Sequence, residues 1–215
     1  MLKSIFTKTK RNLKAGFTLL EMTMVIGIFG VLTAIVAFNY GSFNNQITLT
    51  NLAYEVAMQI RESQVFSLGV RGANGDFNTR YGTYFNSDTD STFIYFADTY
   101  NDGDGICSNS GSGGVCNCVT TGSECLNVIS LTRSMKIDSL WVSDGGDPLT
   151  DPGRREIDTA HITFKRPNPD AIILDGVHVT QYSGVAIIIR SPDNKYKAVV
   201  VLSSGQISVK DYVPD

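Results

Sequence analysis

The chain places its hydrophobic residues in one long block near its start. Residues from Phe17 to Phe38 are nearly all apolar, and no charged residue occurs between Met22 and Tyr54. As an α-helix, these 22 residues would measure about 33 Å, against a bilayer hydrocarbon core of about 30 Å. The pattern therefore predicts a membrane-spanning helix over residues 17–39.

Residues 40–69 read as an amphipathic continuation of that helix. In "ITLTNLAYEVAMQIRESQVFSLG" the apolar residues recur mostly at spacings of three and four, with the charged residues elsewhere. No proline occurs before Pro148, so one helix can run from about Phe17 to about Leu68. The expected place for a kink is Gly41-Ser42.

After Gly69 the period changes to two, in short β-rich runs bounded by Gly, Pro, Asn and Asp. The expected strands are YGTYF, STFIYFA, LNVISL, KIDSLWV, HITFKR, VAIIIRS, KAVVVLS and QISVK. Pro192, Asp193 and Asn194 supply turn chemistry for a hairpin. The patterns together predict an α+β fold, with the long N-terminal helix packed on a C-terminal antiparallel β-rich domain of residues 70–215.

Charge is divided unevenly between the first 16 residues and the rest. The first 16 hold five of the 18 basic residues and no acid, which leaves 13 basic against 21 acidic residues after them. The five are Lys3, Lys8, Lys10, Arg11 and Lys14. Basic flanks stay in the cytoplasm, so the C-terminal domain is expected outside it. A secretory signal is the weaker alternative, because "AIVAFNYGSF" is a poor A-x-A cleavage site.

One acid, Glu21, lies close to the start of the apolar block. A charged side chain in such a segment costs roughly 2.5 to 3.5 kcal/mol on insertion scales, so an acid there indicates function and calls for a partner. The alternative is a plain anchor whose acid reaches the headgroups and is stabilised by the positive end of the helix dipole.

The segment "KAGFTLLEMTMVIGI" resembles the class III leader of type IV pilins and type II secretion pseudopilins, in which a basic leader ends in Gly before Phe-Thr-Leu-Leu-Glu. The resemblance implies that a prepilin peptidase removes residues 1–16, cutting between Gly16 and Phe17, and methylates the new N-terminus. Glu21 then becomes the fifth mature residue, and the Phe17 amine of a neighbouring subunit would neutralise it. The implied partners are other pilin or pseudopilin subunits, an inner-membrane assembly platform, and membrane lipid before assembly.

The order of the later runs is similar to that of minor pseudopilins of the GspH/FimT type. Many major pilins carry a proline near the middle of the span, where this chain has Phe38. The insertion at 101–125, taken as a projecting loop, fits awkwardly into a filament shaft. These features predict a minor structural subunit of a type IV pilus or type II secretion pseudopilus, held in the cytoplasmic membrane before it enters a filament. The alternatives are an individually anchored surface-binding domain and a membrane-tethered enzyme.

All four cysteines lie in the Gly- and Ser-rich insertion. They are Cys107, Cys116, Cys118 and Cys125. Outside the cytoplasm they can oxidise, and we expect two small-loop disulfides. Pairing of Cys116 with Cys118 is the most strained connectivity, and the other two stay open. A four-thiolate zinc site is the rival interpretation, but the chain lacks the paired C-x2-C spacing typical of one.

The turn "ADTYNDGDG" gathers oxygen ligands of the kind that calcium prefers. They are Asp98, Asn101, Asp102 and Asp104. Tyr100 occupies a ligand position of the EF-hand pattern, and such clusters are more often ordinary turns. Calcium is therefore a secondary expectation, and no other cofactor is expected.

Enzyme chemistry has little support in the sequence. His161 and His178 lie in β-rich stretches, and the chain has no H-E-x-x-H, G-x-S-x-G or P-loop motif. The acidic balance after the leader argues against a broad nucleic-acid-binding face. A local basic patch stays open at Arg154, Arg155, Lys195 and Lys197.

Overall fold

The computed structural model describes residues 16–69, 79–99, 104–108, 118, 123–176 and 181–214. The chain divides into two compact units, residues 1–41 and residues 42–215. The leader that the sequence predicts lies outside the described residues, apart from Gly16.

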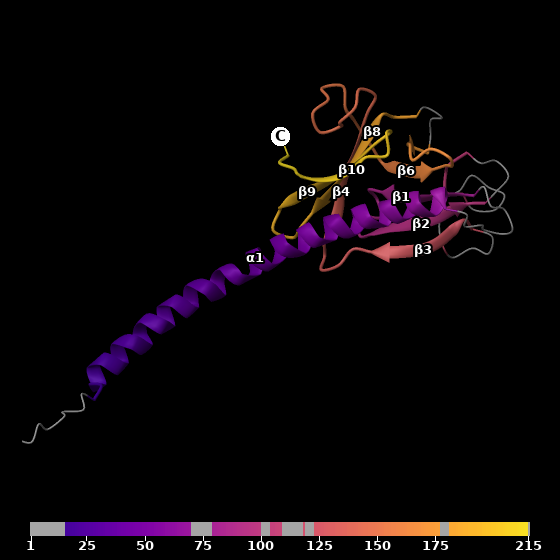
Figure 1. The fold of residues 1–215 in the computed structure, drawn as a ribbon. Coiled ribbons are helices and arrows are strands. Elements are labelled where there is room, and N and C mark those ends of the chain that lie inside the picture. The colour runs from indigo at the N-terminus through magenta and orange to yellow at the C-terminus, as the bar shows by residue number, and fades with distance from the viewer. Residues whose placement is uncertain are drawn as a thin grey trace, which may run out of the picture. The chain divides into compact units, whose positions relative to one another are not determined.

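One helix, α1 (Leu19–Leu68), runs through both units (Figure 1). Its bounds confirm the single long helix predicted from the sequence. In the first unit its apolar side chains are exposed, and the best 18-residue window has a mean hydropathy of 2.2. The helix is thus long and apolar enough to cross a membrane. The assignment is continuous through Gly41-Ser42, and the kink expected there stays a prediction.

The described part of the second unit contains ten strands, each antiparallel to its neighbours. They are β1 (Arg80–Asn86), β2 (Thr92–Asp98), β3 (Cys125–Ser130), β4 (Lys136–Ser143), β5 (Arg155–Ile157), β6 (Thr159–Phe164), β7 (Ala171–Leu174), β8 (Gly184–Arg190), β9 (Tyr196–Leu202) and β10 (Ile207–Asp211). The first sheet has the order β3-β2-β1-β6-β7, and the second β10-β9-β8-β4-β5. The predicted α+β fold is confirmed.

The predicted hairpin joins β8 to β9, with Arg190 opposite Tyr196 at its closed end. Asn194 adopts a φ of 55° in the turn, a region that Asn tolerates better than most residues. The sequence did not predict β5 or β7. They have three and four residues and end their sheets, so an alternating pattern has too few positions to show.

The second half of α1 packs one face against both sheets. The buried face consists of Leu49, Leu52, Ala53, Val56 and Ile60. The same core cluster takes Phe85, Phe93 and Ile162 from the first sheet and Leu140, Ile187 and Val199 from the second. The helix is therefore the element that joins the two sheets into one core.

Polar contacts at the end of α1 reinforce this packing. Gln64 Nε2 donates to the carbonyl oxygens of Pro169 (2.7 Å) and Gly205 (3.2 Å), and Ser67 Oγ accepts from the Tyr81 N–H (2.8 Å). Gly205 has a φ of 80°, and a Cβ there would collide with the Pro169 carbonyl. The close approach between helix and turn thus requires glycine at this position.

Strands β1 and β2 are buried on both faces. On one face, Tyr81 packs edge-on against Phe66 of α1, with ring centroids 6.0 Å apart. On the other face, Tyr84 and Phe96 form a separate cluster with Cys107 of the insertion. Cys107 therefore covers part of a sheet face that would otherwise meet water.

We predict that the two faces of α1 differ sharply in their contribution to stability. Ile60 is 0% exposed and Met58 is 73% exposed. Ile60→Ala should lower the free energy of unfolding by about 2–5 kcal/mol, because it leaves a cavity between the sheets. Met58→Ala, two residues away in the same helix, should change it by less than about 0.5 kcal/mol. Urea unfolding of the detergent-solubilised full chain measures both, and equal losses would contradict the assignment of the buried face.

Candidate functional site

The predicted processing junction lies just before α1. Gly16, Phe17 and Thr18 are not helical, and the Phe17 side chain is 77% exposed. The Glu21 N–H donates to Thr18 Oγ1 at 3.2 Å, which is the N-cap contact that lets the helix begin at Leu19. The junction is thus a non-helical, accessible segment bounded by a capped helix.

Glu21 occupies the first turn of α1 and is exposed. Its N–H is used by the cap, and the described part of the chain shows no ion pair for its carboxylate. The hydroxyls of Thr23 and Thr33 donate to carbonyl oxygens of the helix itself, at 2.9 and 2.7 Å. The two hydroxyls are thus hydrogen-bonded within the helix, whereas the Glu21 carboxylate is a charged group at the edge of an apolar segment.

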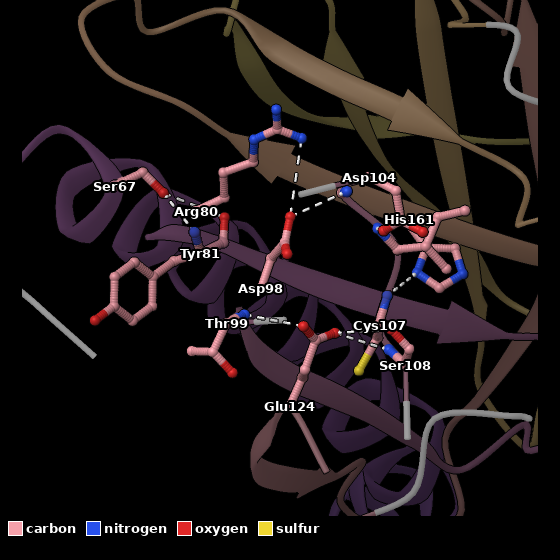
Figure 2. A network of polar contacts seen from close by, with 12 residues as sticks. Ser67, Arg80, Tyr81, Asp98, Thr99, Asp104, Cys107, Ser108, Glu124 and His161 are labelled. Carbon is pink, nitrogen blue, oxygen red and sulfur yellow. Dashed lines mark hydrogen bonds and ion pairs between the residues drawn. The ribbon is translucent and has the colours of Figure 1, made fainter. Parts of the chain in front are cut away.

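A second group of polar residues lies in the β domain, where the insertion meets the first sheet (Figure 2). Asp98 ends β2 and is 6% exposed. Its Oδ2 accepts from the Gly105 N–H at 3.0 Å and faces Arg80 Nη1 at 3.8 Å. Its Oδ1 is buried with no hydrogen-bond partner among the described residues.

Two further acceptors hold the next residues of the insertion. The Cys107 N–H donates to His161 Nδ1 at 3.0 Å, and the Ser108 N–H donates to Glu124 Oε2 at 2.8 Å. Glu124 Oε1 also accepts from the Thr99 N–H at 2.9 Å. Together with Asp98, these side chains hold the backbone of the insertion over β1 and β2 (Figure 2).

Burial sets the protonation of this group. It raises the pKa of Asp98 to about 6, and the nearby Glu124 raises it as well, against the Gly105 N–H and Arg80, which lower it. It lowers the pKa of His161 to about 4. His161 is therefore neutral at pH 7, as its acceptor role at Nδ1 requires.

The cysteines of the insertion form disulfides. Cys118 pairs with Cys125, with Cα atoms 5.1 Å apart, and Cys107 is also disulfide-bonded. Cys116 lies outside the described residues. The Cys118–Cys125 bridge excludes the Cys116–Cys118 pairing, the connectivity we expected to be most strained.

The structure describes only two of the four residues expected to bind calcium. Asn101 and Asp102 lie outside the described residues. Of the other two acids, Asp98 is held by Arg80 and Gly105, and Asp104 Oδ1 accepts from the Ile106 N–H at 2.8 Å. Across the described residues, no group of three His, Cys, Asp or Glu side chains could hold a metal ion. Calcium binding stays a prediction.

The described residues of the insertion divide between buried and exposed positions: Asp104 and Cys118 are exposed, and the expectation of a projecting loop stays a prediction for the residues outside the described ranges. Gly105 and Cys107 are buried, and Glu124 is 2% exposed. The acceptors on the sheet and the apolar contacts of Cys107 draw these residues onto β1 and β2. The sequence showed the Gly- and Ser-rich composition, but it did not show that distant acceptors would bind the backbone.

The four basic residues that left open a local patch do not form one continuous free face. Arg154 lies over the Trp141 ring, with its Cζ 4.9 Å from the centroid. Arg155 pairs with Asp144 at 3.1 Å, and Lys197 pairs with Asp211 at 2.5 Å. Two of the four charges, those of Arg155 and Lys197, are thus paired within the domain, and Lys195 is exposed. His178, the second histidine, lies outside the described residues.

Comparison with known proteins gives one match. A family model described as the prokaryotic N-terminal methylation motif matches residues 11–37. The match includes Gly16, Phe17 and Glu21 and nearly all of the apolar segment 17–38. No curated protein and no solved structure matches the chain.

Two buried groups beside the insertion, Asp98 and His161, make the free energy of unfolding depend on pH in opposite directions. The folded pKa of Asp98 is about 6 against an ordinary 3.8, so its contribution is present at low pH and is lost as pH rises through 6. The folded pKa of His161 is about 4 against 6.5, so its contribution is present above pH 6.5 and is lost as pH falls through 4. Between these limits the two effects oppose one another.

We predict that Asp98→Asn will leave the pH dependence of the free energy of unfolding governed by His161. The variant should lose stability as pH falls from about 6.5 to 4, more steeply than the parent by up to about 1.4 kcal/mol per pH unit. Urea unfolding across this range measures the slope. Asp144→Asn, at a largely exposed carboxylate, is the control and should parallel the parent. His161→Gln should shift the slope in the opposite direction, and parallel curves for all variants would refute the assignment.

Proposed function

Because residues 11–37 match the prokaryotic N-terminal methylation motif, which supports a type IV pilin-like protein, we propose that the chain is a structural subunit of a type IV pilus or type II secretion pseudopilus. A prepilin peptidase would remove residues 1–16 and methylate Phe17. The mature chain would then assemble with other pilin-type subunits through the first half of α1.

The observation that carries this proposal is the first unit itself. Its helix exposes apolar side chains on all sides, and the charged residue of its mature sequence is Glu21, at the start of the helix. Such a surface is stable in lipid or among similar helices and unstable in water. A filament core of packed helices supplies the second environment, and the membrane supplies the first.

Pairing across subunits accounts for the position of Glu21. Cleavage would create a cation at Phe17, two residues before the helix begins. An acid that is costly alone in hydrocarbon costs much less when it is paired. Subunits would therefore assemble in the axial register that brings each Glu21 to a neighbour's Phe17 amine.

The proposed topology is a single pass through the cytoplasmic membrane, with the β domain outside the cytoplasm. The basic leader supports this orientation by the positive-inside rule. The Cys118–Cys125 disulfide supports it independently, because disulfides persist in oxidising compartments.

A minor rather than a bulk subunit is the finer form of the proposal. Phe38, at a place where many major pilins have proline, supports it. The insertion at 101–125, as a projecting loop, was the other expected support, and of its described residues Gly105 and Cys107 are buried while Asp104 and Cys118 are exposed. A minor subunit would seed or cap a filament, with its β domain at the free end.

A catalytic role is the less favoured alternative. His161, the described histidine, is 4% exposed and its Nδ1 accepts a backbone N–H. These contacts support a structural function for it. An individually anchored binding domain is the other alternative, and it differs from a filament subunit in its dependence on Glu21.

We predict that Gly16→Leu will block maturation. A large side chain at the junction should prevent the peptidase from cutting before Phe17, so residues 1–16 would stay attached. Intact-mass analysis of membrane fractions measures the difference. Gly27→Leu, inside α1 but also in open space, should leave cleavage unchanged. Retention of residues 1–16 in the parent chain would refute the processing proposal.

We predict that Glu21→Leu and Glu21→Gln will both enter the membrane and be cleaved, but will be lost from sheared filaments by tenfold or more. The helix cap should survive, because it uses the Glu21 N–H rather than the side chain. Thr33→Val removes a polar group from the same apolar segment and is the control. Quantitative mass spectrometry of filaments provides the measurement. A simple anchor would tolerate Glu21→Leu, so undiminished recovery would favour that alternative.

A further inference from the structure

Thr18 fixes the residue at which α1 begins. Its Oγ1 accepts the N–H of Glu21 at 3.2 Å, and its carbonyl oxygen accepts the N–H of Met22 at 3.2 Å. These are the two contacts of an N-cap residue, which stands half inside the helix and has non-helical backbone. Gly16 and Phe17 therefore lie outside the helix.

The sequence before Thr18 contains no other strong signal to end a helix. Lys14 and Ala15 are good helix formers, and no proline precedes α1. Gly16 disfavours helix but is tolerated within one, as Gly27 shows inside α1. Each residue added to an existing helix gains one hydrogen bond, so a helix extends until a side chain competes for its terminal N–H groups. Thr18 supplies that competition.

Processing requires the Gly16–Phe17 peptide bond to be reachable. Hydrolysis breaks the bond between the Gly16 carbonyl carbon and the Phe17 nitrogen; the oxygen of a water molecule joins the carbonyl carbon, and a proton goes to the departing amine. Within a helix, the carbonyl and N–H groups of the backbone are used by bonds to residues four positions away. A helical bond is therefore cut only after local opening, which lowers the rate by the fraction of chains that are open.

The structure shows this bond in the accessible state. The Phe17 side chain is 77% exposed, and nothing lies within 4 Å of a Cβ placed on Gly16. The order Thr18-Leu-Leu-Glu21 is that of a capping box, a sequence signal for the start of a helix, and the structure forms the Thr18 half of it. The segment next to the cleavage site thus carries its own signal for where the helix starts.

We propose that Thr18 is a positioning residue for processing, because its cap ends α1 just after the Gly16–Phe17 bond and presents that bond to the peptidase as non-helical backbone. This inference rests on the proposed function, which supplies the peptidase. It gives Thr18 a part in cleavage that is separate from the part of Glu21 in assembly. The cap uses the Glu21 N–H, so the Glu21 carboxylate is not needed for it.

Substitutions at Thr18 separate the cap from a direct contact between its hydroxyl and the peptidase. Full-length precursor in detergent micelles is mixed with purified prepilin peptidase, and intact-mass spectrometry at timed intervals gives the initial rate at which residues 1–16 are lost. Thr18→Val keeps the shape of the side chain but cannot cap, and it should be cleaved about fivefold more slowly. Thr18→Ser and Thr18→Asn, which cap well, should stay within twofold of the parent. Thr18→Gly should do so too, because glycine is a fair N-cap without any side chain. Slow cleavage of the Asn and Gly variants would assign the effect to the hydroxyl itself and overturn the proposal.

Thr23→Val is the matched control. Thr23 Oγ1 donates to the Leu20 carbonyl oxygen at 2.9 Å, inside the helix, so its loss does not move the helix start. The rate of cleavage should equal that of the parent. An equal slowing by Thr23→Val and Thr18→Val would contradict a specific role for Thr18.

A proline at the first helical position tests the conformational cause directly. Leu19→Pro fixes the start of the helix by itself, because proline fits that position and keeps the preceding residue out of the helical conformation. In this background Thr18→Val should have no further effect, so the single and double variants should be cleaved at rates within twofold of each other. A fivefold difference that persists between them would refute the proposal. The substitutions at Thr18 alone stand independently of this background.

The same assay separates this inference from the proposed function. If the parent precursor is not cut before Phe17, the proposed processing fails and this inference fails with it. If the parent is cut and Thr18→Val is cut equally fast, the role of Thr18 is refuted while the processing stands.

Discussion

Burial of one face of α1 against both sheets is the contact on which the rest of the β domain depends. The chain crosses from one sheet to the other after β3, after β5 and after β7, so the second sheet begins before the first is complete. The inner residues of both sheets meet the same helical face. Gln64 and Ser67 then bind backbone groups of distant segments, which fixes the end of the helix relative to both sheets. Loss of this packing would leave two sheets with unmatched apolar faces.

The outer face of the first sheet is covered in a different way. Its cover is a segment of low apolar content, held mainly by acceptors at Asp98, His161 and Glu124 and by the apolar contact of Cys107. The Cys118–Cys125 bridge closes a short loop directly before β3, which limits the freedom of the same segment. Ordering the residues around Gly105 and Cys107 costs conformational entropy, and these polar contacts and the disulfide offset that cost.

Much of this architecture could be predicted from the sequence, for local reasons. A 50-residue helix without proline and a hairpin around Pro192–Asn194 depend on neighbouring residues, and both were predicted. The strand run Ile187–Ile189 is continuous rather than alternating because both of its faces are buried, and the run itself was visible. By contrast, β5 and β7 depend on partners supplied by the rest of the sheet. The binding of Gly105 and Cys107 by Asp98 and His161 joins residues up to 54 positions apart, and no local pattern records such contacts.

The start of α1 shows how one short motif can serve both the single chain and the assembly. Thr18 caps the helix through the Glu21 backbone N–H, so the local structure is complete without the Glu21 carboxylate. The carboxylate also lies at the positive end of the helix dipole, which lowers the cost of its charge but does not remove it. What is left is a residual electrostatic cost that a cation at the same depth can relieve. On the proposed function, that cation comes from the Phe17 amine of another subunit, and processing creates it. Assembly would then be coupled to cleavage by the same few residues, since an uncleaved chain has no amine at Phe17 to offer its neighbour.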